Sequence, residues 1–68
     1  MLRLRVKEVA QRKGLNISQL QRKSDLSYNT VRELWHNPFK EVSTETLNKI
    51  ARALDVPVTD LIEDVPEE

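Results

Sequence analysis

The chain has 68 residues, enough for one small domain and too few to tolerate a poorly filled core. It has no cysteine and a single histidine, so disulfide bonds are excluded and a structural zinc site would depend largely on carboxylates. No apolar run is long enough for a signal peptide or a membrane span. We therefore expect a cytoplasmic domain held together by helix packing, with no metal, cofactor or membrane partner.

The formal net charge is zero, but the charges are unevenly divided along the chain. Residues 1–40 carry nine basic and three acidic side chains, whereas residues 41–68 carry two basic and eight acidic ones. A basic half suits a polyanionic partner, although two solvated faces of opposite charge explain the pattern equally well.

A first helix is predicted from about residue 5 to residue 13. Gly14 follows this segment, and glycine readily takes the left-handed conformation that closes a helix. Before the helix, Leu2 and Leu4 alternate with Arg3, which is the period of a strand. A short extended amino-terminal segment is therefore expected, with residues 40–43 as a candidate partner.

Two further helices are predicted over residues 17–24 and 28–36. Asn16 is a good N-cap for the first of them, and Gln19 occupies the capping-box position three residues later. Ser27 caps the next helix, and Pro38 stops it.

Ser43 is predicted to cap a fourth helix, whose apolar residues follow the spacing of a helix buried along one side. Pro57 suits the first turn of a short fifth helix that carries Val58, Leu61 and Ile62. The fold class is therefore all-α, a compact arrangement of five short helices. Residues 1–64 form the domain, and residues 65–68 form an acidic tail.

The helices over residues 17–24 and 28–36 are separated by about three residues, the spacing of a DNA-binding helix-turn-helix. Residues near the start of the second helix of that motif lie closest to the bases, so Tyr28, Asn29 and Arg32 are the predicted base contacts. Arginine can bind guanine through two hydrogen bonds, and asparagine can bind adenine in the same way.

The first turn of the preceding helix offers free backbone donors and a partial positive charge, which suits a phosphate. Asn16, Ser18 and Gln19 surround it and are predicted phosphate contacts. Thr30 and Lys40 are predicted to contact the DNA backbone as well.

Other polar and aromatic residues favour structural roles. Arg3 and Arg5 are compatible with an arm in the minor groove, but ordinary solvent exposure is favoured. Glu33 is expected to pair with Arg32 or a neighbour, since a carboxylate repels phosphate. Trp35 shares a helix face with apolar residues and is expected in the core.

The stretch from residue 5 to residue 62 resembles the phage Cro and repressor type of helix-turn-helix domain, the XRE or lambda-repressor-like family. The matching pieces are, in chain order, Val6-Lys7-Glu8-Val9, Lys13-Gly14-Leu15, Leu20, Leu26-Ser27, Thr30-Val31, Leu34, the run from Glu45 to Leu54, Val56 and Asp60-Leu61-Ile62. The sequence departs from the family at Gln21, where a small residue is usual, and at Asp25, where glycine is usual. Gln21 must bend aside or form a hydrogen bond near the junction of the two helices.

The resemblance implies a five-helix transcriptional regulator that binds an inverted repeat in double-stranded DNA as a homodimer, without a small-molecule ligand. The dimer surface is expected around the fifth helix, at Val58, Ile62 and Val65. The alternative is an antitoxin-like adaptor or other protein-interaction module that keeps the fold without reading DNA. An enzyme is not expected, because no nucleophile with a base and no paired carboxylates are recognisable.

Overall fold

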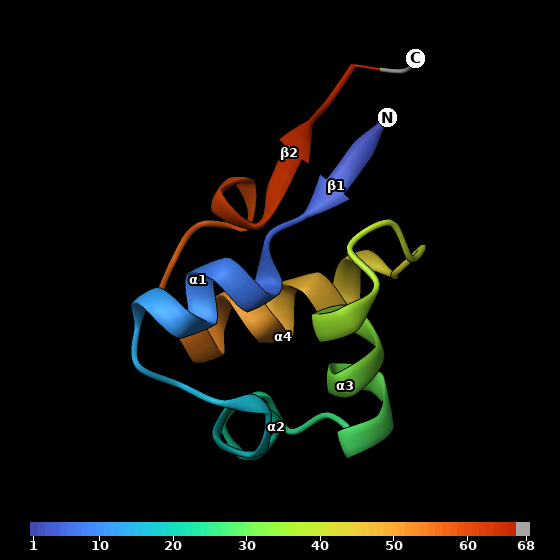
Figure 1. Cartoon of the computed structure of the whole chain (residues 1–68). Helices are drawn as coiled ribbons and strands as arrows, with labels where there is room; N and C mark the ends of the chain where they lie inside the picture. The colour runs from blue at the N-terminus through green and yellow to red at the C-terminus, as the bar shows by residue number, and fades with distance from the viewer. Residues whose placement is uncertain (67–68) are drawn as a thin grey trace.

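The computed structural model describes residues 1–66, which fold into a mostly helical domain with a small pair of strands (Figure 1). The elements in chain order are β1 (Leu2–Leu4), α1 (Val6–Arg12), α2 (Ile17–Ser24), α3 (Tyr28–His36), α4 (Thr44–Leu54), the 3-10 helix η1 (Val58–Leu61) and β2 (Ile62–Asp64). The four predicted helices α1 to α4 are confirmed, and the observed bounds of α2 and α3 are those expected from the sequence.

The predicted fifth α-helix is wrong. After Pro57 the chain makes only the single 3-10 turn η1, and Ile62 then begins the strand β2. β2 pairs antiparallel with β1, so that Leu4 lies opposite Ile62 and Leu2 lies opposite Asp64. The strand takes precedence because β1 needs a partner for its backbone groups, and a β-branched residue such as Ile62 suits a strand.

The extended amino-terminal segment is confirmed as β1, but its predicted partner at residues 40–43 is wrong. The loop after α3 supplies only one backbone contact to this segment, from the Leu4 N–H group to the Pro38 carbonyl oxygen at 2.6 Å. The Arg5 N–H group donates instead to the carbonyl oxygen of Leu61 at 2.8 Å. The two ends of the described chain are therefore joined along β1 and β2.

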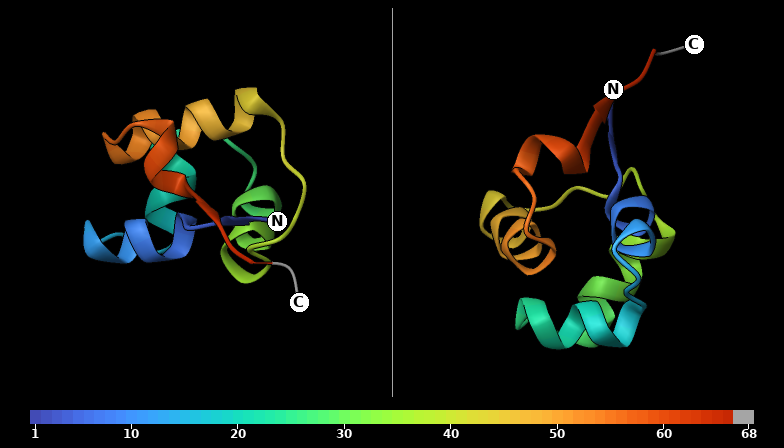
Figure 2. Two further views of the ribbon diagram at one scale, coloured as in Figure 1. Left: turned by 90° about the horizontal axis from the view of Figure 1, so that it is seen from above. Right: turned by 90° about the vertical axis from the view of Figure 1, so that its left-hand side faces the viewer.

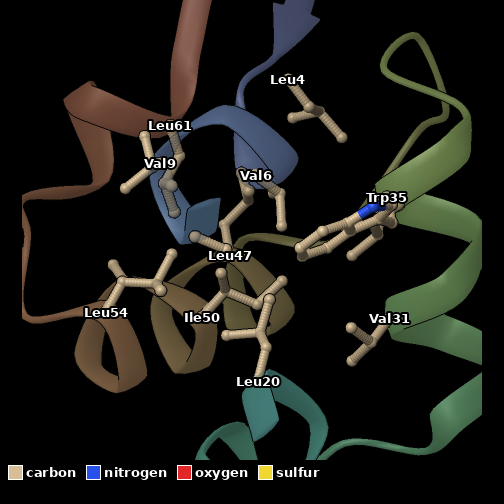
Figure 3. Packing of buried hydrophobic residues seen from close by; sticks show 13 residues of the cluster. Leu4, Val6, Val9, Leu20, Val31, Trp35, Leu47, Ile50, Leu54 and Leu61 are labelled. Atoms are coloured by element: carbon tan, nitrogen blue, oxygen red, sulfur yellow. The ribbon is translucent and has the colours of Figure 1, made fainter. Parts of the chain in front are cut away.

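The buried core draws side chains from every element except β2, whose half-buried Ile62 packs against it (Figure 3). Figure 3 shows Leu20 of α2, Val31 of α3 and Ile50 of α4 directed into one interior, and all three are fully buried. Trp35 is 9% exposed and closes the same cluster, which confirms its predicted place in the core. Because α2 and α3 both contribute to this core, their relative placement depends on its packing.

Two of the helices end in the same way. After α1, the Leu15 N–H group donates to the Ala10 carbonyl oxygen and Gly14 has a φ of 78°. After α4, the Val56 N–H group donates to the Ala51 carbonyl oxygen, and Asp55 takes the left-handed conformation with a φ of 57°. Both are Schellman-type ends, which satisfy carbonyl groups that the helix leaves free.

The two strands lie at one end of the molecule, and α2 and the start of α3 lie at the other (Figure 1). In Figure 1 the strands extend from the top of the domain, α2 and the start of α3 lie at the bottom, and α1 and α4 lie between them. The side view in Figure 2 shows the same order, and the molecule is longest in one direction, 36 × 21 × 20 Å. Within residues 1–66, no helix has the length and apolar character needed to cross a bilayer.

Candidate nucleic-acid interface

The start of α2 is fixed by a complete capping box. Asn16 Oδ1 accepts a hydrogen bond from the Gln19 N–H group at 2.8 Å, and Gln19 Oε1 accepts one from the Asn16 N–H group at 2.9 Å. The box is the one predicted from the sequence. It uses both side-chain oxygens and leaves the amide NH₂ groups of Asn16 and Gln19 as donors.

The same geometry leaves two backbone donors at the first turn of α2. The N–H groups of Ile17 and Ser18 have no partner among residues 1–66, because the capping box serves Gln19 and the Leu20 N–H group bonds to the Asn16 carbonyl oxygen. Ser18 is exposed. This turn therefore presents several N–H donors and the positive end of a helix dipole to solvent.

The turn between α2 and α3 consists of Asp25, Leu26 and Ser27. Asp25 adopts a left-handed conformation, with φ 58° and ψ 34°, and so occupies the place where the family resemblance leads one to expect glycine. Ser27 then caps α3, its Oγ accepting a hydrogen bond from the Thr30 N–H group at 3.2 Å. The turn thus forms with an aspartate at its left-handed position, which is tolerated better there than most residues.

Gln21, the other residue at which the sequence departs from the family pattern, forms a hydrogen bond. Its Nε2 donates to the carbonyl oxygen of Leu26 at 2.7 Å, in a half-buried position between the two helices. The same helix turn also holds the buried hydroxyl of Ser24, which donates to the Gln21 carbonyl oxygen at 3.3 Å. Of the two alternatives that the sequence left open for Gln21, hydrogen bonding near the junction is the one observed.

The three predicted base-contact residues lie together on the solvent side of α3. Tyr28, Asn29 and Arg32 are exposed, and Tyr28 retains 48% of its accessible surface. Within the described part of the chain, no hydrogen bond or ion pair engages their side chains. The opposite side of the same helix, with Val31 and Trp35, is buried in the core.

Thr30 is less available than these three residues. It is half-buried, and its Oγ1 lies 2.8 Å from the Ser27 Oγ in a hydrogen bond between the two hydroxyls. A contact from Thr30 to a phosphate would therefore extend an existing pair of hydroxyls rather than use a free one.

Lys40 is held against α3 by Glu33. The Lys40 ammonium forms an ion pair with the Glu33 carboxylate, so the predicted partner of Glu33 is the neighbouring Lys40 and not Arg32. The loop turns back at Asn37, whose Oδ1 accepts from the Phe39 N–H group at 3.3 Å. The hydrogen bond from Lys40 and its positive charge lower the pKa of the Glu33 carboxyl, with a smaller contribution from Arg32.

Arg3 is part of the strand pair and lies at the end of the molecule away from α2. Its guanidinium pairs with Glu63 of β2 at 3.1 Å and with Glu8 of α1. Hydrogen bonding to Glu8 raises the pKa of Arg3. Arg3 therefore belongs to the fold and is not a free arm, and Arg5 is the half-buried residue that precedes α1.

The residues predicted for a dimer surface are only partly brought together. Val58, Ile62 and Val65 are each half-buried, and Ile62 lines two apolar hollows on the surface. One hollow, of about 420 Å³, is also lined by Leu2 and Phe39, which are 62% and 50% exposed, and the other is lined by Val58. Val65 lines neither. We refer to Leu2, Phe39, Val58 and Ile62 as the Ile62 face.

Comparison with known families gives one match that covers most of the chain. The sequence model of the Cro/C1-type helix-turn-helix DNA-binding domain matches residues 5–67. The match includes all four α-helices and the turn between α2 and α3. No curated protein matches the chain.

Proposed function

The chain belongs to the Cro/C1-type helix-turn-helix DNA-binding family, and from this premise we propose that it binds specific double-stranded DNA sequences as a small transcriptional regulator. In this proposal α3 lies in the major groove and α2 lies across the DNA backbone. The observation that carries the proposal is that the side chains of Tyr28, Asn29 and Arg32 on α3 are exposed and have no partner within residues 1–66. The first two N–H groups of α2 likewise have none there.

Base recognition is assigned to Tyr28, Asn29 and Arg32. The Arg32 guanidinium can donate two hydrogen bonds to a guanine, and the Asn29 amide can donate to and accept from an adenine. Tyr28 can contact a thymine methyl group or donate to a phosphate. The exposure of all three side chains supports this assignment, since none has to break a bond within the described chain to reach a base.

Phosphate binding is assigned to the first turn of α2 and to the flanking polar residues. The NH₂ groups of Asn16 and Gln19 stand beside the free N–H groups, and Ser18 adds a hydroxyl. Thr30 and Lys40 are further candidates, each of which already has a partner in the free protein.

We further propose that the protein binds DNA as a homodimer through the Ile62 face. Exposed Leu2 and Phe39 flank an apolar hollow, and a symmetric dimer needs one surface that is complementary to itself. The two α3 helices would then contact half-sites about 34 Å apart, one turn of DNA.

The deciding experiment is selection of bound duplexes from a random pool, followed by measurement of their affinity at several salt concentrations. A palindromic consensus is the expected result, with a log-log salt dependence near −0.9 for each phosphate contact. Absence of duplex binding at low salt would contradict the proposal and favour the protein-interaction module.

A further inference from the structure

The Gln21 hydrogen bond ends on a peptide group that has no other partner. The Leu26 carbonyl oxygen accepts from Gln21 Nε2, and no backbone N–H group of the described chain donates to it. The regular hydrogen bonds of α3 begin one residue later, with the Val31 N–H group and the Ser27 carbonyl oxygen. Gln21 therefore holds the peptide that directly precedes Ser27, the N-cap of α3.

That peptide sets the direction in which α3 begins. It is followed directly by Ser27, the N-cap, and by Tyr28 and Asn29, the first two residues of the helix. Leu26 is half-buried against the core, so one side of the turn is held by packing and the other by the Gln21 amide. A rotation of this peptide would move the first turn of α3, where two of the predicted base contacts, Tyr28 and Asn29, lie.

The hydrogen bond from Gln21 to Leu26 depends on the length and chemistry of the Gln21 side chain. Alanine or serine at position 21 is too short to reach the Leu26 carbonyl, and an ionised glutamate has no hydrogen to donate. Because the contact is half-buried, water substitutes for it only in part.

We propose that Gln21 is a positioning residue for α3, and that its hydrogen bond to Leu26 fixes where Tyr28 and Asn29 lie relative to the first turn of α2. This inference rests on the proposed function, because it assigns base contacts to the start of α3. It concerns the discrimination between DNA sequences rather than the fold, which the core and the caps maintain.

The first measurement uses the free protein. Residual dipolar couplings of the backbone N–H groups in α2 and α3 report the relative orientation of the two helices in wild type, Gln21→Ala and Gln11→Ala. Gln11 is exposed on α1 and makes no side-chain hydrogen bond within residues 1–66, so it is the matched control. A changed orientation in Gln21→Ala alone is expected, and an unchanged orientation would overturn the proposal, whatever happens with DNA.

The second measurement compares the selected duplex with a scrambled one, at a temperature where circular dichroism shows all variants fully folded. We expect the preference of Gln21→Ala for the selected duplex to fall by about threefold to tenfold, the effect of one hydrogen bond, with little change in scrambled-duplex affinity. An equal loss on both duplexes, or no loss, would contradict a positioning role.

A Gln21→Glu variant tests the donor itself and serves if Gln21→Ala does not fold. Its carboxylate cannot donate near neutral pH, whereas its protonated form, which predominates only below about pH 4.3, can donate to Leu26. The preference of Gln21→Glu for the selected duplex, relative to that of wild type at the same pH, should therefore recover on acidification. Gln11→Glu should show no such recovery. A preference that is low at every pH would overturn the assignment of the donor.

If wild type binds no duplex, the proposed function fails, and the dipolar couplings alone decide whether Gln21 orients α3.

Discussion

The carboxylate of Glu33, on the exposed side of α3, forms an ion pair with the ammonium of Lys40 in the loop that follows the helix. This pair places an acidic group between a predicted base contact, Arg32, and a predicted phosphate contact, Lys40. If the protein binds DNA as proposed, phosphates would come close to both charges, and a carboxylate repels them. We therefore expect Glu33 to weaken DNA binding, both by this repulsion and by keeping Lys40 in an ion pair.

We expect Glu33→Gln to raise the affinity for duplexes of any sequence, by about twofold to tenfold at low salt, and to steepen the log-log salt slope by up to about 0.9. Electrophoretic or fluorescence titrations at several salt concentrations measure both quantities. Glu41→Gln removes the same charge from the same loop without releasing Lys40, so it should have a smaller effect. A salt slope identical in Glu33→Gln and wild type would show that Lys40 makes no additional contact with a phosphate in the variant.

The roles assigned to Arg32 and Lys40 predict different phenotypes for the two alanine variants. Arg32→Ala should weaken binding to the selected duplex and relax the preference at one base pair of each half-site, with about 1 to 3 kcal/mol of discrimination lost. Lys40→Ala should weaken binding to all duplexes to a similar degree. A panel of single-base variants of the selected duplex distinguishes the two outcomes, and equal losses on every duplex from both variants would refute the assignment.

The sequence predicted the helix-turn-helix well because its signals are local. Asn16 with Gln19, and Ser27 with the residues after it, mark the helix starts through contacts within three residues, which any helix beginning there would form. The sequence could not predict which of its two alternatives Gln21 adopts. Its hydrogen-bond acceptor lies beyond the end of α2, and the position of that acceptor depends on the conformation of Asp25.

The sequence failed where distant segments decide the structure. Val58, Leu61 and Ile62 fit a helical period, but the same residues equally fit one 3-10 turn followed by a strand, and the choice depends on β1 at the other end of the chain. Lys40 could not be singled out as the partner of Glu33 for a related reason, since the turn at Asn37 brings Lys40 back to α3.

The left-handed Asp25 predicts an order of stability at this position. Glycine takes this conformation without a steric penalty, and aspartate takes it at a modest cost in free energy. The cost is higher for alanine. We expect Asp25→Gly to be at least as stable as wild type and about 1 kcal/mol more stable than Asp25→Ala, measured by urea unfolding. Asp55 has the same conformation outside the helix-turn-helix, so Asp55→Gly and Asp55→Ala should give the same order. Greater stability of Asp25→Ala over Asp25→Gly would contradict the assigned conformation.

We expect two carboxyl groups to make the stability depend on pH in the acidic range. Lys40 lowers the pKa of Glu33, and the pKa of Glu8 is also lowered, because hydrogen bonds from its own backbone and from Arg3 outweigh the opposing effect of burial. A carboxyl group with a depressed folded pKa stabilises the fold above its unfolded pKa, and this contribution is lost as the pH falls through the folded value.

The free energy of unfolding should therefore decrease as the pH is lowered below about 4.5, the ordinary value for glutamate, and should vary less above it. Urea unfolding at successive pH values measures the trend. The double variant Glu8→Gln and Glu33→Gln should be less stable than wild type at neutral pH and should lose less stability on acidification. If its curve runs parallel to that of wild type, other groups are responsible for the acid sensitivity.

The proposed dimer through the Ile62 face predicts that one charged substitution separates the subunits without unfolding them. Phe39 is half-exposed in the monomer and lines the hollow beside Leu2, so Phe39→Glu places a charge in the interface while removing little from the core. Burial of a phenylalanine side chain contributes about 1.5 to 3 kcal/mol, so the dimer dissociation constant should rise by at least about tenfold. Sedimentation velocity over a range of concentrations measures this change. Tyr28→Glu replaces another exposed aromatic residue, which begins α3 and does not line the hollow, and it should leave the sedimentation unchanged while impairing DNA binding. A wild-type protein that remains monomeric on its selected duplex, or a Phe39→Glu variant that dimerises like wild type, would rule out this face as the interface.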